Sequence, residues 1–223
     1  MEIDIIWSDN NVLAVNKPAG LLTIPDGYHP ELPCVINFLK TSWGQLWVVH
    51  RLDKETSGIL LFARNAPTHK LLNEQFQNRQ VHKIYRAIIV GNPDWDRQEI
   101  HFPLKVDGDR KHRTRVNLPG GKSAQSDVTV ITRFPGYSLV EVRPHTGYTH
   151  QIRAHLSAAG FPIVSDPLYD NNSEVHNQIL PRVGLHAFQI TFWLPDANEP
   201  MTLTAPYPPE FQEGLDRLGQ LNN

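Results

Sequence analysis

The prediction of the fold starts from the segment Leu46–Ala63, LWVVHRLDKETSGILLFA. Its two continuous apolar runs, Leu46–Val49 and Ile59–Ala63, predict strands that are buried on both faces. Between them stands the polar stretch His50–Gly58, and loops at the ends of rigid strands are where catalytic groups tend to lie. Asp53 is therefore a candidate catalytic residue. The alternative is that Asp53 only caps a turn and pairs with a neighbouring cation.

Strands outnumber helices along the rest of the chain. Apolar patterns predict strands over 3–7, 12–15, 83–90, 127–134, 138–143, 185–194 and 201–204. Helices are expected over 35–39, 66–79 and 208–218, and from a cap at Thr149 to Gly160. Because short turns join most of these strands, the sequence predicts an α+β fold whose central mixed, mostly antiparallel β-sheet is flanked by helices and loops. With no repeat and no clean linker, we expect a single domain over residues 1–223.

Composition narrows the class of protein. Hydrophobic residues make up 40% and charged residues 20% of the 223 residues, which are globular values. One cysteine, Cys34, excludes an internal disulfide and a Cys-rich zinc site. The N-terminus has no signal-peptide pattern, and no apolar run is long enough to span a bilayer. We therefore expect a soluble, cytoplasmic protein without a membrane partner.

The formal net charge of −2 argues, taken alone, against a nucleic-acid binder. Residues 50–160, however, hold seventeen basic and ten acidic side chains, a balance of +7, and the flanking segments carry −9. A basic segment can attract a polyanion although the whole chain is near neutral. The alternative is that the charges fall unevenly by chance and mix again in the fold.

The sequence contains no complete motif for binding a nucleotide or a metal. The run Gly120–Ser123 lacks the first glycine of a phosphate loop, since Val116 stands there, and no G-x-G-x-x-G occurs. No H-E-x-x-H is present, and the twelfth position of a calcium loop starting at Asp107 is Leu118. The sequence therefore predicts neither a bound metal nor a nucleotide cofactor.

Five segments carry a resemblance to the RluA family of RNA pseudouridine synthases. In the family's order they are Asn16–Gly20 (N-K-P-x-G), His50–Gly58 (H-R-L-D-x-x-T-S-G), Lys83–Ala87 (K-x-Y-x-A), Thr146–His155 (T-G-R-x-H-Q-I-R-x-H) and Gly160–Tyr169. The resemblance covers nearly the whole chain, without the family's frequent N-terminal S4 module. It implies a pseudouridine synthase fold with an RNA-binding cleft.

The resemblance implies a reaction that needs no cofactor. The uridine N1–C1′ bond breaks, the base turns over, and the base rejoins the ribose through C5. Asp53 matches the essential carboxylate, acting as nucleophile or base. Arg153 matches its salt-bridge partner, and Tyr85 matches the tyrosine that packs on the target base.

Further matches imply RNA contacts and a pocket floor. Ile163 matches the aliphatic residue that closes the pocket. Arg51 matches the arginine that fills the space left by the flipped nucleotide, or else it neutralises Asp53. The remaining candidates for RNA contact are His50, His150, Lys17 and Thr56. A basic, turn-rich stretch predicts either a loop that contacts the RNA backbone or a solvated loop; its cations are Lys105, Arg110, Lys111, Arg113 and Arg115.

The chain departs from the family pattern at three places. Tyr148 replaces the arginine of T-G-R, and Ser165 and Asp170 replace glycines around the last motif. The expected partner is rRNA or a tRNA stem-loop, bound by a monomer. The alternatives are a catalytically silent RNA-binding or ribosome-assembly protein with the same fold, and a hydrolase that uses Asp53 and Glu55 as paired carboxylates.

Overall fold

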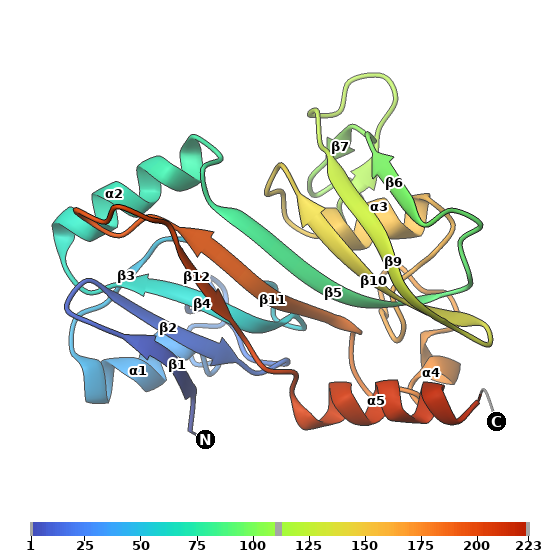
Figure 1. Ribbon diagram of the computed structural model, residues 1–223, viewed down its shortest axis with the longest axis horizontal. Coiled ribbons are helices and arrows are strands. Elements are labelled where there is room, and N and C mark those ends of the chain that lie inside the picture. The colour runs from blue at the N-terminus through green and yellow to red at the C-terminus, as the bar shows by residue number, and fades with distance from the viewer. Residues whose placement is uncertain (1, 110–112, 222–223) are drawn as a thin grey trace. The chain divides into compact units, whose positions relative to one another are not determined.

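The computed structural model describes residues 2–109 and 113–221 and divides the chain into two compact units. Unit 1 comprises residues 1–83 and 186–207, and unit 2 comprises residues 84–185 and 208–223. Figure 1 labels the elements in chain order.

Unit 1 is built on a mixed sheet. Its elements are β1 (Asp4–Ser8), β2 (Val12–Lys17), α1 (Val35–Trp43), β3 (Trp47–Val48), β4 (Ser57–Ala63), α2 (Ala66–Gln77), β11 (Leu185–Phe192) and β12 (Met201–Thr204). The strands follow the order β1-β2-β4-β11-β12, and β3 also pairs with β4. All pairs are antiparallel except β4 with β11, where His186 lies opposite Ser57 and Ala187 opposite Gly58.

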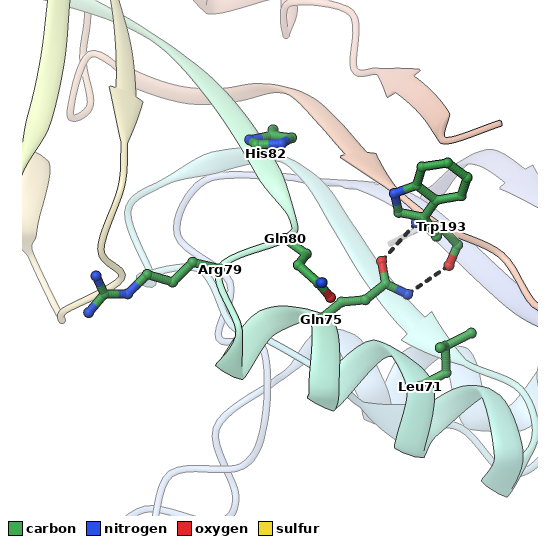
Figure 2. Close-up of a pocket in the computed structure, with 6 residues that line it drawn as sticks. All are labelled: Leu71, Gln75, Arg79, Gln80, His82 and Trp193. Carbon is green, nitrogen blue, oxygen red and sulfur yellow. Dashed lines mark hydrogen bonds between the residues drawn. The ribbon is translucent and has the colours of Figure 1, made fainter.

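The interior of unit 1 follows from the apolar run in β4. All seven residues of β4 are buried, which confirms the prediction of a strand covered on both faces. Helix α2 begins where the Asn65 side chain accepts a hydrogen bond from the Thr68 backbone N–H at 2.9 Å. The buried Gln75 of α2 binds the backbone of Trp193 twice, at 2.9 and 2.8 Å (Figure 2). These bonds fix the chain just after β11.

Unit 2 carries an antiparallel sheet with α3 packed on one face. Its elements are β5 (His82–Val90, beginning at the end of unit 1), β6 (Arg97–Ile100), β7 (Leu104–Lys105), β8 (Arg115–Val116), β9 (Ser126–Phe134), β10 (Tyr137–Pro144), α3 (Gln151–Ala158), α4 (Ser173–His176) and α5 (Pro209–Gln220). The sheet order is β5-β10-β9-β6, and β7 pairs with β8 separately. Ile152 and Leu156 of α3 pack against Val128, Val140 and Ile163.

The expectation of an α+β fold with a mixed, mostly antiparallel sheet is confirmed. Two local predictions are wrong. The run Leu46–Val49 does not form a strand buried on both faces, because only Trp47 and Val48 belong to β3 and both are half-buried. Thr149 does not cap α3. The N-cap is His150, whose φ of 54° is left-handed and whose side chain makes no capping bond. Over residues 2–109 and 113–221, no helix is long and apolar enough to cross a membrane. The same residues include no group of three or more His, Cys, Asp or Glu that could hold a metal ion.

Candidate active site

The loop that carries Asp53 is fixed on both sides by the end of β2 and the segment that follows it. On one side, the carbonyl oxygen of Lys54 accepts bonds from the Gly20 backbone N–H at 2.8 Å and from the Lys17 ammonium at 3.0 Å. On the other side, the Thr23 hydroxyl bonds both the N–H and the C=O of Leu52, at 3.2 and 3.1 Å. Asp53 itself is half-buried. Its backbone is therefore held in place by residues far from it in the sequence.

Lys17 and Thr56 lie inside unit 1 rather than on its surface. The Lys17 side chain is fully buried, and its ammonium group also donates to the carbonyl oxygens of Pro18 and Leu21, at 2.9 and 2.6 Å. Thr56 is buried, and its backbone N–H donates to the Asp53 carbonyl at 3.1 Å. Both residues support the loop around Asp53.

His50 is held as a neutral ring. The Leu61 backbone N–H donates to His50 Nε2 at 3.0 Å, so this nitrogen carries no proton. The ring stacks on Phe76 with centroids 4.8 Å apart. Burial, and to a smaller degree the charge of Lys83, lowers the pKa of His50 to about 3. The exposed Arg51 follows directly after it.

The depressed pKa of His50 predicts stability that is lost in acid. The unfolded chain takes up this proton near pH 6.5, whereas the folded protein does so only near pH 3. The unfolded state therefore binds more protons below pH 6.5, so stability is fully present above that pH and falls as the pH drops toward 3. The expected slope is at most about 1.4 kcal/mol per pH unit. Urea unfolding at pH 7, 6 and 5 measures it.

A matched pair of variants tests whether His50 causes this slope of stability against pH. His50→Gln keeps an acceptor for the Leu61 N–H and should flatten the slope, although burial of His155 acts in the same direction and leaves part of it. His82→Gln, at an exposed histidine, should keep the wild-type slope. Equal slopes in wild type and His50→Gln would contradict a neutral His50.

In unit 2, Arg153 forms a buried ion pair with Asp166. Its Nε and Nη2 each lie 2.7 Å from a carboxylate oxygen, and the two side chains are 3% and 0% exposed. The Tyr169 ring lies 5.2 Å from the Arg153 guanidinium and 5.9 Å from the His150 ring. Tyr169 thus joins two predicted site residues, His150 and Arg153. A pairing of Arg153 with Asp53 stays a prediction.

Asp166→Asn is expected to destabilise the protein by about 3 kcal/mol or more, because it removes the carboxylate charge that binds the buried Arg153 guanidinium through two contacts of 2.7 Å. The control is Glu213→Gln, which removes an exposed i,i+4 pair with Arg217 and should cost less than about 1 kcal/mol. Chemical unfolding of both variants gives the two values. Equal, small losses would show that the buried pair is not needed for the fold.

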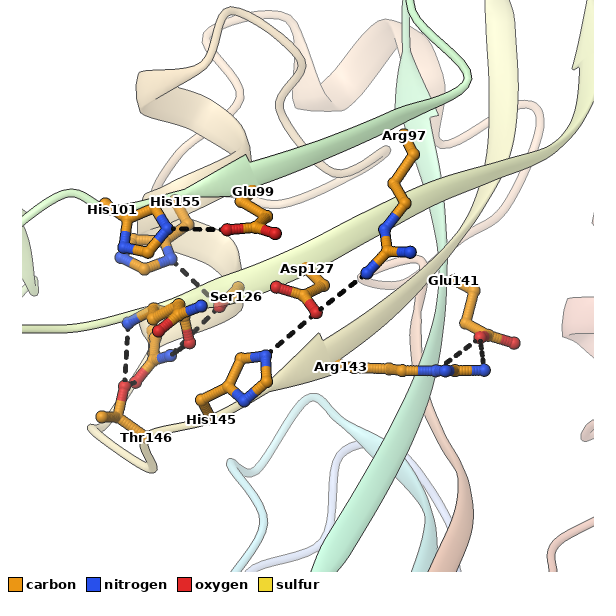
Figure 3. A network of polar contacts seen from close by, with 12 residues as sticks. Arg97, Glu99, His101, Ser126, Asp127, Glu141, Arg143, His145, Thr146 and His155 are labelled. Atoms are coloured by element: carbon orange, nitrogen blue, oxygen red, sulfur yellow. Dashed lines mark hydrogen bonds and ion pairs between the residues drawn. The ribbon is translucent and has the colours of Figure 1, made fainter.

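A buried polar network lies beneath the start of α3 (Figure 3). Ser126 Oγ lies 3.0 Å from His155 Nδ1 and 3.1 Å from Gln151 Nε2, and the Thr146 hydroxyl donates to Gln151 Oε1 at 2.7 Å. Burial lowers the pKa of His155, so the neutral ring donates from Nε2 to the Phe102 carbonyl at 3.0 Å and accepts the Ser126 hydroxyl at Nδ1. The network fixes where α3 begins.

Tyr85 and Ile163 belong to the same apolar cluster of unit 2. Ile163 is fully buried and bridges to Ile89 of β5. Tyr85 is partly buried and packs against this cluster. Ile163 is therefore part of the core of unit 2.

The three departures from the family pattern are accommodated within unit 2. The Lys122 ammonium lies 5.9 Å above the Tyr148 ring. Ser165 is buried with a left-handed φ of 58°, and its hydroxyl donates to the Leu180 carbonyl at 2.7 Å. Asp170 pairs with His176 at 2.6 Å.

The basic loop is described only in part. Exposed Lys105 and Arg115 lie opposite each other in the β7–β8 pair, and Arg113 pairs with Asp109 at 2.7 Å. Opposed like charges are unfavourable without an anion nearby. Two further predicted cations, Arg110 and Lys111, lie outside the described residues.

Sequence reasoning did not identify Asp166, Thr23 or His186 as supporting residues. In the sequence, only its position within the segment Gly160–Tyr169 pointed to Asp166. His186 Nδ1 lies 2.8 Å from the buried Ser57 hydroxyl, and its Nε2 lies 3.2 Å from the Ala205 carbonyl. These contacts join segments that are far apart in the chain, and a single sequence does not reveal them.

Comparison with known proteins gives one consistent result. The model of the family described as RNA pseudouridylate synthase matches residues 11–158. A Haemophilus influenzae protein named dual-specificity RNA pseudouridine synthase RluA is 35% identical over 204 residues, which are 91% of this chain and 92% of that protein. A Neisseria meningitidis ribosomal large subunit pseudouridine synthase D is 34% identical over 98% of this chain and 62% of its own length.

Solved structures agree with the sequence relatives. The structure of human RNA pseudouridylate synthase domain containing 4 is similar with a TM-score of 0.79 and 27% identity. The match covers 97% of this chain and 93% of the human one.

Proposed function

The chain belongs to the RluA family of RNA pseudouridine synthases, enzymes that isomerise uridine to pseudouridine in RNA, and from this premise we propose that Asp53 is its catalytic carboxylate. The carboxylate acts on the ribose of the target uridine, as nucleophile or as base, while the N1–C1′ bond breaks. The C5–C1′ bond then forms, C5 loses its proton, and N1 gains one. No atom is added and no group is oxidised, so the proposal includes no cofactor.

The observation that carries this proposal is the fixation of the Asp53 loop. Catalytic groups must be held close to the productive geometry by neighbours that are themselves locked. Bonds from Lys17 and Gly20 on one side and from Thr23 on the other hold the backbone next to Asp53. For the buried Lys17 and Thr56 we propose this indirect role, in which they support the loop.

The other proposed roles follow the motif matches. Tyr85 packs on the uracil and lies near C5 for the final proton loss, with Ile163 as the floor. Arg153, held by Asp166, takes the role of salt-bridge partner of the catalytic carboxylate that its motif match implies. We propose that the chain acts as one catalytic domain.

RNA binding is proposed to proceed by base flipping. A uridine inside a stem-loop must leave the stack before C1′ is accessible, at a cost of a few kcal/mol. The exposed Arg51 offsets part of this cost by stacking and by phosphate contact. His150 is proposed as an RNA contact, and His50 as the neutral support behind Arg51.

The proposed substrate is a stem-loop of rRNA or tRNA, bound by a monomer in the cytoplasm. The relatives' names include both a dual-specificity and a large-subunit enzyme, so they do not separate the two kinds of RNA. Selectivity is proposed to come from RNA shape and from the energy of flipping one base, with weak binding to arbitrary RNA.

Mapping of pseudouridines in total RNA tests the proposal. In cells without the gene, one or a few pseudouridines in rRNA or tRNA should be missing. The wild-type gene should restore them, and the Asp53→Asn gene should not. If every pseudouridine persists without the gene, the proposed function is wrong.

A further inference from the structure

Unit 1 contains a recess of about 560 Å³ beside α2. It is lined by Leu71, Gln75, Arg79, Gln80, His82 and Trp193 (Figure 2). Leu71, Gln75 and Arg79 follow each other at intervals of four residues, which places them along one side of α2 and its end. Phe76, a quarter-turn further around the helix, stacks on His50 instead. The recess is therefore distinct from the Asp53 loop.

Trp193 offers an exposed aromatic surface on a fixed backbone. Its side chain is among the exposed large hydrophobic groups, at 41%. The two bonds from the Gln75 amide hold its backbone N–H and C=O at 2.8 and 2.9 Å. A ring whose backbone is already ordered loses little freedom when a planar group stacks on it, which is how aromatic side chains bind unpaired bases.

Arg79 occupies a position that helix geometry favours for glycine. The Gln80 N–H bonds the Gln75 carbonyl at 2.9 Å and the Arg79 N–H bonds the Phe76 carbonyl at 3.3 Å, the pattern that ends a helix with a left-handed residue. That residue is Arg79, with φ of 57°. A side chain at such a φ is strained, and strained residues concentrate at functional sites.

The ionisable residues that line the recess are basic, as expected of a site that binds an anion. None of the six lining residues is acidic, and Arg79 and His82 are the ionisable ones. Both are exposed, as is the Gln80 amide, which can bond the edge of a base. An aromatic face, an amide and a guanidinium match the base and phosphate of a nucleotide.

We propose that this recess binds an unpaired nucleotide of the RNA substrate, with the base stacked on Trp193 and the phosphate next to Arg79. The site is a second contact for the substrate, outside the target uridine. This inference rests on the proposed function, because that function identifies RNA as the substrate. Binding of a nucleotide in the recess does not require turnover.

The test measures the Kd of the purified full-length protein for in vitro transcripts of tRNA and large-subunit rRNA carrying 5-tritiated uridine. Trp193→Ala should raise the Kd about tenfold or more, and Trp193→Phe should restore most of the loss. Trp7→Ala is the matched control, because Trp7 is 40% exposed on β1 of the same unit and does not line the recess. Its Kd should equal that of wild type.

Arg79→Gly separates binding from folding. Glycine relieves the strain at this φ, so the Tm should stay or rise. The Kd should increase, and the slope of log Kd against log salt should fall by about 1, because one phosphate contact is lost. Unchanged Kd values in both Trp193→Ala and Arg79→Gly would contradict the proposal that the recess binds a nucleotide. A wild type that binds as expected without releasing tritium would overturn the proposed function and leave the recess supported.

Discussion

Asp53→Asn is expected to abolish pseudouridine formation, lowering turnover by at least about 10³-fold while the protein remains folded and binds RNA. Asparagine has nearly the same shape as aspartate, and the loop is held through the backbones of Leu52 and Lys54. The substitution thus removes the charge and the nucleophilic oxygen while these backbone hydrogen bonds remain. Tritium release from RNA carrying 5-tritiated uridine measures turnover, and filter binding measures RNA affinity.

Glu55→Gln is the matched control for Asp53→Asn. Glu55 is the nearest other carboxylate in the sequence, and a hydrolase with paired carboxylates would need both groups. We expect this variant to keep activity within a few-fold of wild type. Full activity in Asp53→Asn would contradict the assignment of the catalytic carboxylate, and equal losses in both variants would favour a paired mechanism.

Gly58→Ala is expected to destabilise the protein by about 4 kcal/mol or more, which is among the largest effects of a single substitution. Gly58 has a φ of 114°, where side chains are strained, and it lies opposite Ala187 in the parallel β4–β11 pair. A Cβ at this position would stand 2.2 Å from the Ala187 carbonyl oxygen and 2.7 Å from the Ala187 carbonyl carbon. Because those atoms belong to the backbone, the two strands would have to separate.

Gly136→Ala separates the clash from the strain of a positive φ. Gly136 has a φ of 77° in the turn between β9 and β10, but an added Cβ there meets nothing within 4 Å. Its cost should be about 1 kcal/mol. Chemical unfolding of both variants gives the comparison. A Gly58→Ala protein as stable as Gly136→Ala would show that β4 and β11 are less closely paired than described.

The longer elements could be predicted because their apolar pattern is local. The run Ile59–Ala63 predicts the buried strand β4, and the alternation in 127–134 and 138–143 predicts β9 and β10. The short elements β6, β7, β8 and α4 could not be predicted, since two to four residues hold too little pattern. Thr149 was a reasonable cap by residue type, but the left-handed His150 begins α3 instead.

The candidate site could be predicted only in part. The motif around Asp53 indicates the catalytic loop, but nothing in the order of residues reveals that Thr23 and Lys17 hold it from two sides. The partner of Arg153 within unit 2, Asp166, is thirteen residues away and faces it only once the chain turns after α3. Such contacts depend on tertiary packing, which a single sequence does not record.

The whole-chain charge of −2 was the wrong test for RNA binding. The arginines proposed to bind RNA or the catalytic carboxylate, Arg51, Arg79 and Arg153, all lie in the segment 50–160, whose balance is +7. The near-neutral total instead favours weak binding to arbitrary RNA. Nanomolar affinity for unrelated RNA at physiological salt would contradict that expectation.

The most direct measurement incubates the purified wild-type protein, without added cofactor, with in vitro transcripts of rRNA and tRNA that carry 5-tritiated uridine. We predict that tritium enters the water in an amount equal to the pseudouridine formed, at one or a few sites, and that Asp53→Asn releases none. Salt-dependent binding of these RNAs with no tritium release from any of them would contradict it and would indicate a catalytically silent RNA-binding protein.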